Sequence, residues 1–599
     1  MGYIVITQFL ILVIAIFLHF KNYLEASRRY IPMGLLTTAL QSLWLWVMHL
    51  KNPYTSNTHL YDLFTVGKAS CSLGLLSDAL SITGACLISI IAAMAGFYTV
   101  GYARKNSSIL LVYISALALI STIFSAAYNL LQMYIAFESM AVLLHFAQQS
   151  GKEAGPPTKH PVESVFPPHK IADVGFFLAM GMTLYTFGSL NFDDINQASI
   201  GNDARLGSME LISAFLLAHV FISHLAGWIK NFLKTSENIP ISALVLSCST
   251  PIVYIFPLIR LQTIFECSEA VQNSIIISGL AFAVCFAIKA TFSNKINNIL
   301  AYSSCSQMGL MFMACGFSAY GAGILLLITH AFSKSLLTFI SGSVIYALSG
   351  ENNFHRIGGL FELLPKTYAV FVAATVSIIC FPLMSSYYAN RALLVEIANS
   401  DQRLYWLALM AIVATSTLTS IYMCRLVYKI FHGQRNMDET TLAYLNESDK
   451  YMGNVCYVSL FLSIFSGVIF YHAAYADEIW RYVFAFTEVE DRYASVPLMF
   501  LNSLGIACAL LVCRAVKRPA IYGKLKLRLQ KFPDIQEIGR MLIRYSGNLI
   551  NEKIRVPFGS GSGGGNFWHD GFAILFTSSP AFGLVSMTLL AFLYLALRT

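Results

Sequence analysis

Two ionisable side chains lie in the middle of a long apolar segment of this sequence. His330 and Lys334 are four residues apart in ILAYSSCSQMGLMFMACGFSAYGAGILLLITHAFSKSLLTFISGSVIY, residues 299–346. If the segment is helical, this spacing places both side chains on one face. An ammonium and an imidazole inside a lipid-immersed helix need a polar partner or a water-filled path. The pair therefore indicates transfer of protons or ions. The alternative, a lysine reaching to an interface, is disfavoured because apolar sequence continues for several turns on either side.

Two carboxylates lie in or beside other apolar segments. Glu138 is near the middle of LLQMYIAFESMAVLLHF, where an unpaired charge would be costly. We interpret it as a proton carrier, although a protonated carboxyl that only joins two helices would give the same pattern. Asp173, in HKIADVGFF, is close to a predicted helix start, where the helix dipole stabilises a carboxylate. Its own surroundings favour a structural role.

The remaining candidates are two histidines and one arginine. His219 and His224 share LISAFLLAHVFISHLAGWIKNF, but five-residue spacing does not align them on one helix face. A lone histidine on an apolar face is usually a hydrogen-bonded core residue. Arg391, in FPLMSSYYANRALLVEI, follows Pro382 in a segment that this proline can interrupt. An interfacial arginine beside a helix kink explains Arg391 equally well. Arg425 is interpreted as a positive anchor near the end of its span.

The scaffold for these residues is predicted to be an all-α polytopic membrane protein. Of 599 residues, 56% are hydrophobic and only 12% are charged, whereas soluble domains carry about a quarter of their residues as charges. Apolar runs of about 20 residues recur along the chain and predict about 16 transmembrane helices. They lie at 3–20, 31–49, 79–101, 108–125, 126–147, 170–188, 209–232, 241–265, 273–292, 296–316, 320–347, 367–396, 403–431, 453–475, 496–515 and 574–596.

Prolines and a basic segment add detail to this layout. Pro251 and Pro257 predict interrupted helices in the core, and interrupted helices at membrane depth are typical of transporters. The proline-rich stretch at 148–170 predicts a loop. The segment 514–555 is basic and amphipathic, which predicts a helix lying along a surface. A Gly/Ser linker at 559–565 and a last span at 572–597 follow it.

Several kinds of site are absent from the sequence. The 12 cysteines are scattered singly, without CxxC spacing, so neither zinc nor iron–sulfur ligands are indicated. There is no Walker A loop and no HExxH motif, and no basic aromatic patch for nucleic acid. We expect no cofactor and no metal in this chain. Its driving force must then come from an ion gradient or from a partner.

At NNILAYSSCSQMGLMFMACGFSAYGAGILLLITHAFSKSLLTFISGS the chain resembles the antiporter-like membrane subunits of respiratory complex I. NADH-ubiquinone oxidoreductase chain 5 fits best, and the Mrp-type cation/proton antiporter subunits are related. The elements LAYSxxSQMG, THAFSKSLL, SGS and HRIGGL stand in the family order, and PISALVLSC at 240–248 resembles the family's TPISALIHA. The resemblance is good over about 70–431 and extends to the ends in layout only. There, the basic segment and terminal span are similar to the lateral helix and anchoring helix of chain 5.

The resemblance implies a proton path and assigns residues to it by position. Glu138 matches the glutamate of the family's fifth span, and Asp173 matches the aspartate of its NRVGD motif. His330 and Lys334 match the histidine and lysine of THAFxK. This family moves protons along a buried axis of acidic, histidine and lysine residues.

Other positions depart from the family pattern. His224, in SHLAG, stands where the family has the lysine of GKSAQ. Leu246 and Leu326 each replace a histidine. Asn390 and Arg391 stand at the family's terminal pair of a lysine and an acid. The path persists if His224 titrates and Arg391 supplies fixed positive charge.

The resemblance also implies a domain plan and an assembly. It divides the chain into N-terminal helices (1–125), an antiporter-like proton-translocation core (126–431), peripheral helices (432–515), a lateral helix with linker (516–571) and an anchoring helix (572–599). The expected function is proton translocation by a membrane-arm subunit of NADH:ubiquinone oxidoreductase, in the mitochondrial inner membrane. FMN, iron–sulfur clusters and ubiquinone are expected in partner subunits. The expected partners are the neighbouring antiporter-like subunits along the lateral helix, and lipids.

Two alternatives share these motifs. One is a stand-alone Mrp-type antiporter that exchanges sodium or potassium for protons. The lateral segment argues against it, because such a segment needs neighbouring subunits to lie along. The other is a structural complex I subunit whose proton path has lapsed, which Leu246, Leu326 and Asn390 motivate.

Overall fold

The computed structural model describes residues 1–476 except 53–54, 67–68, 104–105, 151–166, 200–205, 223–237, 401–402, 436 and 438–444. Several predictions lie outside the described residues. They are His224, the span at 496–515, the lateral helix and linker at 516–571, and the anchoring helix at 572–599.

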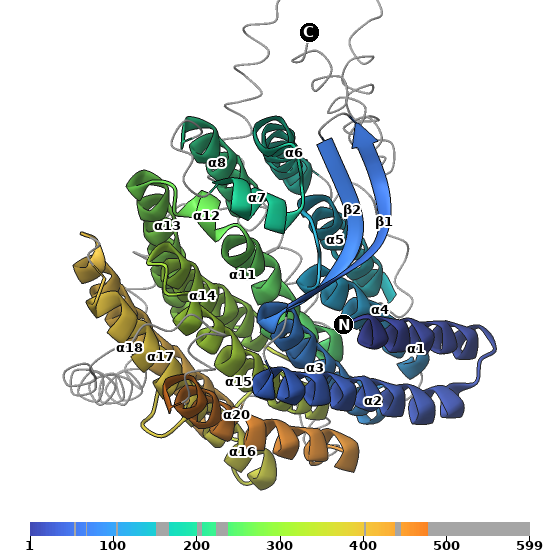
Figure 1. Cartoon of the computed structure of the whole chain (residues 1–599). Helices are drawn as coiled ribbons and strands as arrows, with labels where there is room; N and C mark the ends of the chain where they lie inside the picture. The colour runs from blue at the N-terminus through green and yellow to red at the C-terminus, as the bar shows by residue number, and fades with distance from the viewer. Residues whose placement is uncertain are drawn as a thin grey trace, which may run out of the picture.

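The described part of the chain is a bundle of membrane-length helices (Figure 1). Ten helical stretches in it are long and apolar enough to cross a membrane, which confirms the predicted helical membrane class. The helices before residue 223 are α1 (Gly2–Phe20), α2 (Leu24–Lys51), α3 (Ala79–Tyr102), α4 (Ser107–Ser125), α5 (Leu130–Ser150), α6 (Pro167–Phe187), α7 (Phe192–Ser199) and α8 (Leu206–Ile222). After residue 237 come α10 (Ile239–Leu244), the π-helix η3 (Val245–Ser249), α11 (Thr250–Arg260), α12 (Gln262–Phe265), α13 (Glu269–Phe292), α14 (Ile296–Gly316), α15 (Tyr320–Ala347), α16 (Pro365–Ile378), α17 (Ser385–Ala398), α18 (Tyr405–Val427), the π-helix η4 (Tyr428–His432) and α20 (Lys450–Ala476).

A β-hairpin between α2 and α3 was not predicted. Strands β1 (Ser56–Val66) and β2 (Ala69–Ser77) pair antiparallel and project from the bundle as a long hairpin (Figure 1). The Leu76 amide donates to the Ala126 carbonyl at 2.9 Å, which ties β2 to the loop before α5. The all-α prediction therefore misses one sheet. The strand sequences do not show the regular polar–apolar alternation that predicts a strand, because two register shifts interrupt the pairing.

Helix α15 is almost completely enclosed and lies between α14 and α20 (Figure 1). Every residue from Tyr320 to Ile345 is buried. An apolar helix in a bilayer gains nothing by leaving lipid for protein, so its enclosure depends on close packing and polar contacts between helices. This enclosure removes the interfacial interpretation of Lys334, whose side chain cannot reach the surface.

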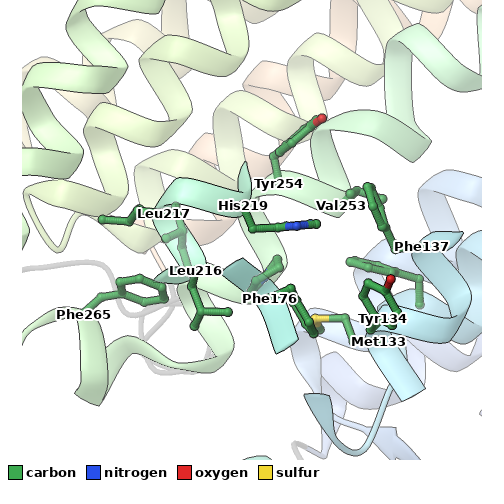
Figure 2. Close-up of a pocket in the computed structure, with 13 residues that line it drawn as sticks. Met133, Tyr134, Phe137, Phe176, Leu216, Leu217, His219, Val253, Tyr254 and Phe265 are labelled. Carbon is green, nitrogen blue, oxygen red and sulfur yellow. The ribbon is translucent and has the colours of Figure 1, made fainter. Parts of the chain in front are cut away.

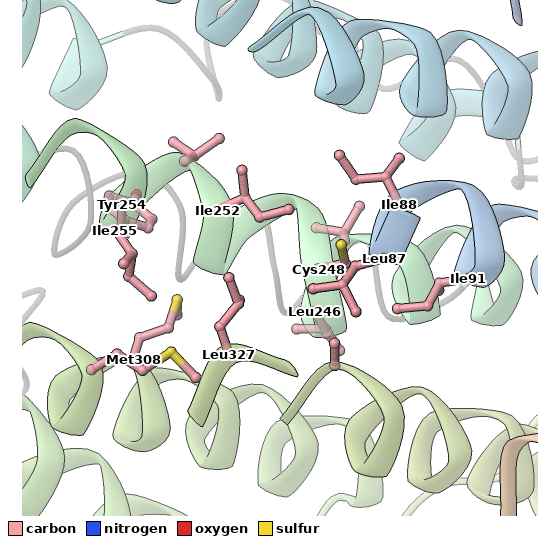
Figure 3. Packing of buried hydrophobic residues seen from close by; sticks show 14 of the residues in the cluster. Leu87, Ile88, Ile91, Leu246, Cys248, Ile252, Tyr254, Ile255, Met308 and Leu327 are labelled. Carbon is pink, nitrogen blue, oxygen red and sulfur yellow. The ribbon is translucent and has the colours of Figure 1, made fainter. Parts of the chain in front are cut away.

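The interruption predicted at Pro251 is present as a π-helix, whereas Pro257 lies inside the continuous helix α11 and does not break it. The π-helix η3 directly precedes Thr250 and Pro251, where the ring nitrogen cannot donate to the preceding turn. Segment η3–α11 packs between α3 and the pair α14–α15 through Ile88, Cys248, Ile252 and Leu327 (Figure 3). The second predicted span of this kind, 367–396, is two helices. Helices α16 and α17 are separated by six residues, of which Cys380 and Leu383 have φ values of 57° and 71°.

An ion pair fixes the end of α11 against the start of α3. Arg260 binds both carboxylate oxygens of Asp78, and the Asp78 carboxylate also caps α3 through the Ser81 amide at 3.0 Å. Burial by itself would raise the pKa of Asp78, but the charge and hydrogen bonds of Arg260 lower that pKa to about 2. The carboxylate therefore stays charged at neutral pH.

Helices α13 and α14 cross with their backbones in contact. A Cβ added to Gly279 would lie 2.6 Å from the Met313 amide nitrogen, and one added to Gly309 would collide with the Ala283 amide nitrogen. Glycine at both positions allows this approach, as in other membrane helix pairs. The crossing supports α15, because α14 packs directly against it.

We expect Gly309→Ala to destabilise the protein, because the new methyl group must push two backbones apart. A loss of about 1–3 kcal/mol is typical of overpacking. The control is Gly323→Ala, where the nearest atom to the new Cβ is the Ala314 Cβ at 3.5 Å, an ordinary contact. Thermal unfolding of the detergent-solubilised protein measures both. Equal midpoints for the two variants would contradict the close crossing.

Candidate functional site

Lys334 and His330 line a small polar cavity at the centre of the bundle. Lys334 is fully buried, and His330 is 8% exposed. The cavity has space for about one water molecule. Its lining comes from four helices, α14, α15, α16 and α17: Ser303, Gln307, Leu326, Thr329, His330, Ser333, Lys334, Ile378, Ser386 and Asn390. The predicted pair therefore shares one helix face and one cavity.

The Lys334 amine donates no hydrogen bond to any of the described residues. Its Nζ is buried without a hydrogen bond in that part of the chain. His330 has a contact of its own, since its Nε2 lies 3.4 Å from the Leu246 carbonyl oxygen in η3. A buried amine without a partner is costly when charged, and water in the polar cavity is the available way to hydrate it.

The structure places Asn390, not Arg391, in this cavity. The Asn390 amide donates to the Ser386 carbonyl at 2.8 Å and to the Cys380 sulfur at 3.0 Å. Arg391, the next residue of α17, stacks its guanidinium over the Tyr471 ring of α20 at 5.5 Å. Arg391 is not one of the residues that line the cavity.

A second cluster joins α5, α6 and α8. Asp173 is fully buried, and its Oδ1 lies 4.0 Å from Nδ1 of His219. Glu138 is half-buried, one turn after Tyr134 on α5. Since Tyr134 interacts with both Glu138 and Asp173, the two predicted carboxylates belong to one cluster. This arrangement gives Asp173 a partner that its own sequence surroundings did not reveal.

His219, interpreted from the sequence as a core residue, also belongs to this cluster. The imidazole meets the rings of Phe137 and Phe176 edge-on, at 5.4 and 5.1 Å. It points into a largely apolar cavity of about 40 Å³ between α5, α6, α8 and α11 (Figure 2). The contact with Asp173 joins helices far apart in sequence, so residue spacing offered no signal for it.

Arg425 has a structural position. Its guanidinium donates to the carbonyl oxygens of Thr291 and Ser293, at 2.8 and 2.7 Å, and to the Asn294 side chain at 2.8 Å. It closes the turn between α13 and α14 as a buried C-cap. Among the described residues, no three His, Cys, Asp or Glu side chains lie close enough to hold a metal ion.

Comparisons with known proteins come from sequence and from structure. Residues 127–419 match the family model described as NADH:quinone oxidoreductase/Mrp antiporter, transmembrane region. NADH-ubiquinone oxidoreductase chain 5 of Chondrus crispus is 25% identical over 434 residues, which are 69% of this chain and 65% of that protein. Subunit L of the NADH-quinone oxidoreductase of Rickettsia bellii is 25% identical over 411 residues, or 65% of this chain and 62% of that protein. The chain thus spans less than two thirds of these relatives' length.

Two solved structures share the fold. The Mrp complex from a Dietzia species matches with a TM-score of 0.72 at 16% identity, over 98% of this chain and 63% of that chain. An archaeal respiratory membrane complex, the membrane-bound sulfane sulfur reductase, matches with a TM-score of 0.64 at 14% identity, over 84% of this chain and 98% of that chain. Both similarities concern the arrangement of helices.

We expect Asp173 and His219 to be energetically coupled. Combining Asp173→Asn with His219→Gln in a double-mutant cycle should give a coupling energy of about 0.5–3 kcal/mol in thermal unfolding, as for other side chains in contact. The control cycle pairs Asp173→Asn with His19→Gln on α1, where His19 contacts Ser108 of α4. Additive effects in the first cycle would show that the two groups do not interact.

Proposed function

We propose, on the premise that this chain belongs to the NADH:quinone oxidoreductase/Mrp antiporter transmembrane family, that it translocates protons as a membrane-arm subunit of respiratory complex I. The observation that carries the proposal is the Lys334 amine. It is buried in a closely packed helix, has no hydrogen-bond partner among the described residues, and lines a polar cavity. An ionisable group in that position destabilises the fold, so its presence favours a role in proton transfer.

The proton path we propose runs from the α5–α6–α8 cluster to the Lys334 cavity. Electron transfer elsewhere in the complex changes the protonation or pairing of Glu138, and the change passes through His224 to Lys334. A nearby positive charge disfavours a protonated lysine and a negative charge favours it. Asp173 and His330 complete the path, and Arg391 supplies fixed positive charge from beside Tyr471.

The energetic demand is moderate. Moving one charge against 100 mV costs roughly 2.3 kcal/mol. A charge interaction of that size is within reach in a poorly hydrated interior, where two charges are weakly screened. The enclosure of α15 therefore serves the function, because bulk water would weaken the coupling between the groups.

The proposed setting follows from the same premise. The chain lies in the mitochondrial inner membrane, beside other antiporter-like subunits and in contact with lipids. It holds no cofactor itself, and FMN, iron–sulfur clusters and ubiquinone reside in partner subunits. Relatives named NADH-ubiquinone oxidoreductase chain 5 support this setting.

A stand-alone Mrp-type antiporter is the second candidate. The shared fold with the Mrp complex favours it. Purification distinguishes the two, because a complex I subunit copurifies with flavin and iron–sulfur centres. Proton movement that requires sodium or potassium and no NADH would identify the antiporter instead. A structural subunit with a lapsed path is the third, and Leu246 and Leu326, both 2% exposed, motivate it.

Lys334→Ala and Glu138→Gln should lower the number of protons moved per NADH oxidised while the complex still assembles. The reason is that each change removes one titrating group, and the amount of assembled complex controls for the packing lost with the buried Lys334 side chain. The measurement is proton uptake by sealed membrane vesicles, alongside NADH oxidation and the amount of assembled complex. The control is Lys366→Ala, an exposed lysine at the start of α16. Normal pumping by the Lys334→Ala complex would refute the proposed path.

A further inference from the structure

Three buried serines from three helices form a closed ring of hydrogen bonds. The Oγ atoms of Ser333 on α15 and Ser377 on α16 are 3.1 Å apart. Those of Ser377 and Ser463 on α20 are 2.7 Å apart, and Ser463 Oγ lies 3.1 Å from Ser333 Oγ. The three residues are at most 1% exposed. A hydroxyl both donates and accepts, so this ring is a continuous chain of exchangeable protons.

The ring opens onto the Lys334 cavity. Ser333 precedes Lys334 in α15, and both residues line that cavity. A water molecule placed in the cavity would have the Lys334 amine and the Ser333 hydroxyl within its lining as partners. The unpartnered amine is thus separated from the ring by the space of about one water molecule.

On the other side, a second pair of hydroxyls lies toward the break between α16 and α17, and no hydrogen bond joins it to the ring within the described part of the chain. Ser466 lies three residues after Ser463, one turn further along α20, and its Oγ is 2.9 Å from Ser385 Oγ. Ser385 is the first residue of α17. In the break before it, Leu383 has a φ of 71° and a side chain 71% exposed. Non-glycine residues held in this conformation cluster at functional sites.

We propose that Ser333, Ser377 and Ser463 form a proton relay between Lys334 and the break between α16 and α17. This inference rests on the proposed function and adds a branch to it. The relay leaves the glutamate, histidine and lysine axis sideways. Its last member, Ser463, lies on α20, beyond residues 127–419 that match the family model.

The transfer balances with two water molecules, one in the Lys334 cavity and one as the final acceptor at the break between α16 and α17. The ammonium of Lys334 gives a proton to the cavity water, which gives one of its own to Ser333. Each serine oxygen then gains one O–H bond as it releases its proton to the next oxygen. One proton enters the ring at Ser333 and another leaves it from Ser463 to the second water molecule, and the amine is left neutral. Rotation of the hydroxyls restores the starting arrangement.

The competing explanation is packing, because serines often join membrane helices. Two sets of variants separate the roles in the intact complex. Ser333→Ala, Ser377→Ala and Ser463→Ala remove one hydroxyl each, and Ser463→Thr keeps the hydroxyl but adds a methyl group. The matched control is Ser335→Ala, because the Ser335 hydroxyl is as buried but bonds only to Phe332 of its own helix.

The readout is protons moved per NADH oxidised in sealed vesicles, normalised to assembled complex. A relay predicts that each ring alanine variant falls to the value of Lys334→Ala, that Ser463→Thr pumps better than Ser463→Ala, and that Ser335→Ala pumps normally. Normal pumping by the ring alanine variants, or a better result for Ser463→Ala than for Ser463→Thr, overturns the relay. If Lys334→Ala alone loses pumping, the relay is wrong and the proposed function stands. If Lys334→Ala pumps normally, the proposed function itself fails.

Discussion

A buried amine in an apolar helix is the constraint on which the centre of this structure depends. Lys334 has apolar residues above and below it on α15, and helices on every side. An ammonium there must be hydrated or neutralised, because an unpaired charge at that position would cost several kcal/mol and destabilise the bundle. The polar side chains from α14, α16 and α17 that surround the cavity meet this requirement. The close crossing of α13 and α14 and the broken pair α16–α17 hold those side chains in place.

The two polar clusters are separated by apolar packing. This packing includes Leu246 of η3, Ile252 of α11, Met308 of α14 and Leu327 of α15 (Figure 3). The leucines at 246 and 326 stand where the sequence pattern led us to expect histidines in the related family. Hydrocarbon in place of imidazole removes hydrogen-bonding partners for water between the clusters. Communication between them by charge does not require contact, since an electric field is weakly screened in such an interior.

Irregular helix segments supply hydrogen-bonding groups near the positions where the related family has histidines. The π-helix η3 presents the Leu246 carbonyl to His330, so a backbone oxygen takes the place of a side chain at that position. The break before α17 similarly ends α16 beside Ser377 and begins α17 at Ser385. In both places the chain uses backbone or hydroxyl groups, which are small enough for a closely packed core.

The sequence by itself determined the membrane class, most spans, the interrupted segments and the pairing of His330 with Lys334. These features depend on local hydropathy, proline and a four-residue helical period, all of which are readable along one chain. Tertiary structure alone decided that Asn390 faces the cavity while Arg391 turns to Tyr471, because adjacent helix positions point about 100° apart and only packing fixes the rotation. It also decided that His219 meets Asp173 and that Ser463 meets Ser333 and Ser377. Those contacts join residues 46 to 130 positions apart, and the hydroxyl and imidazole side chains involved look like ordinary core residues until their helices are packed together.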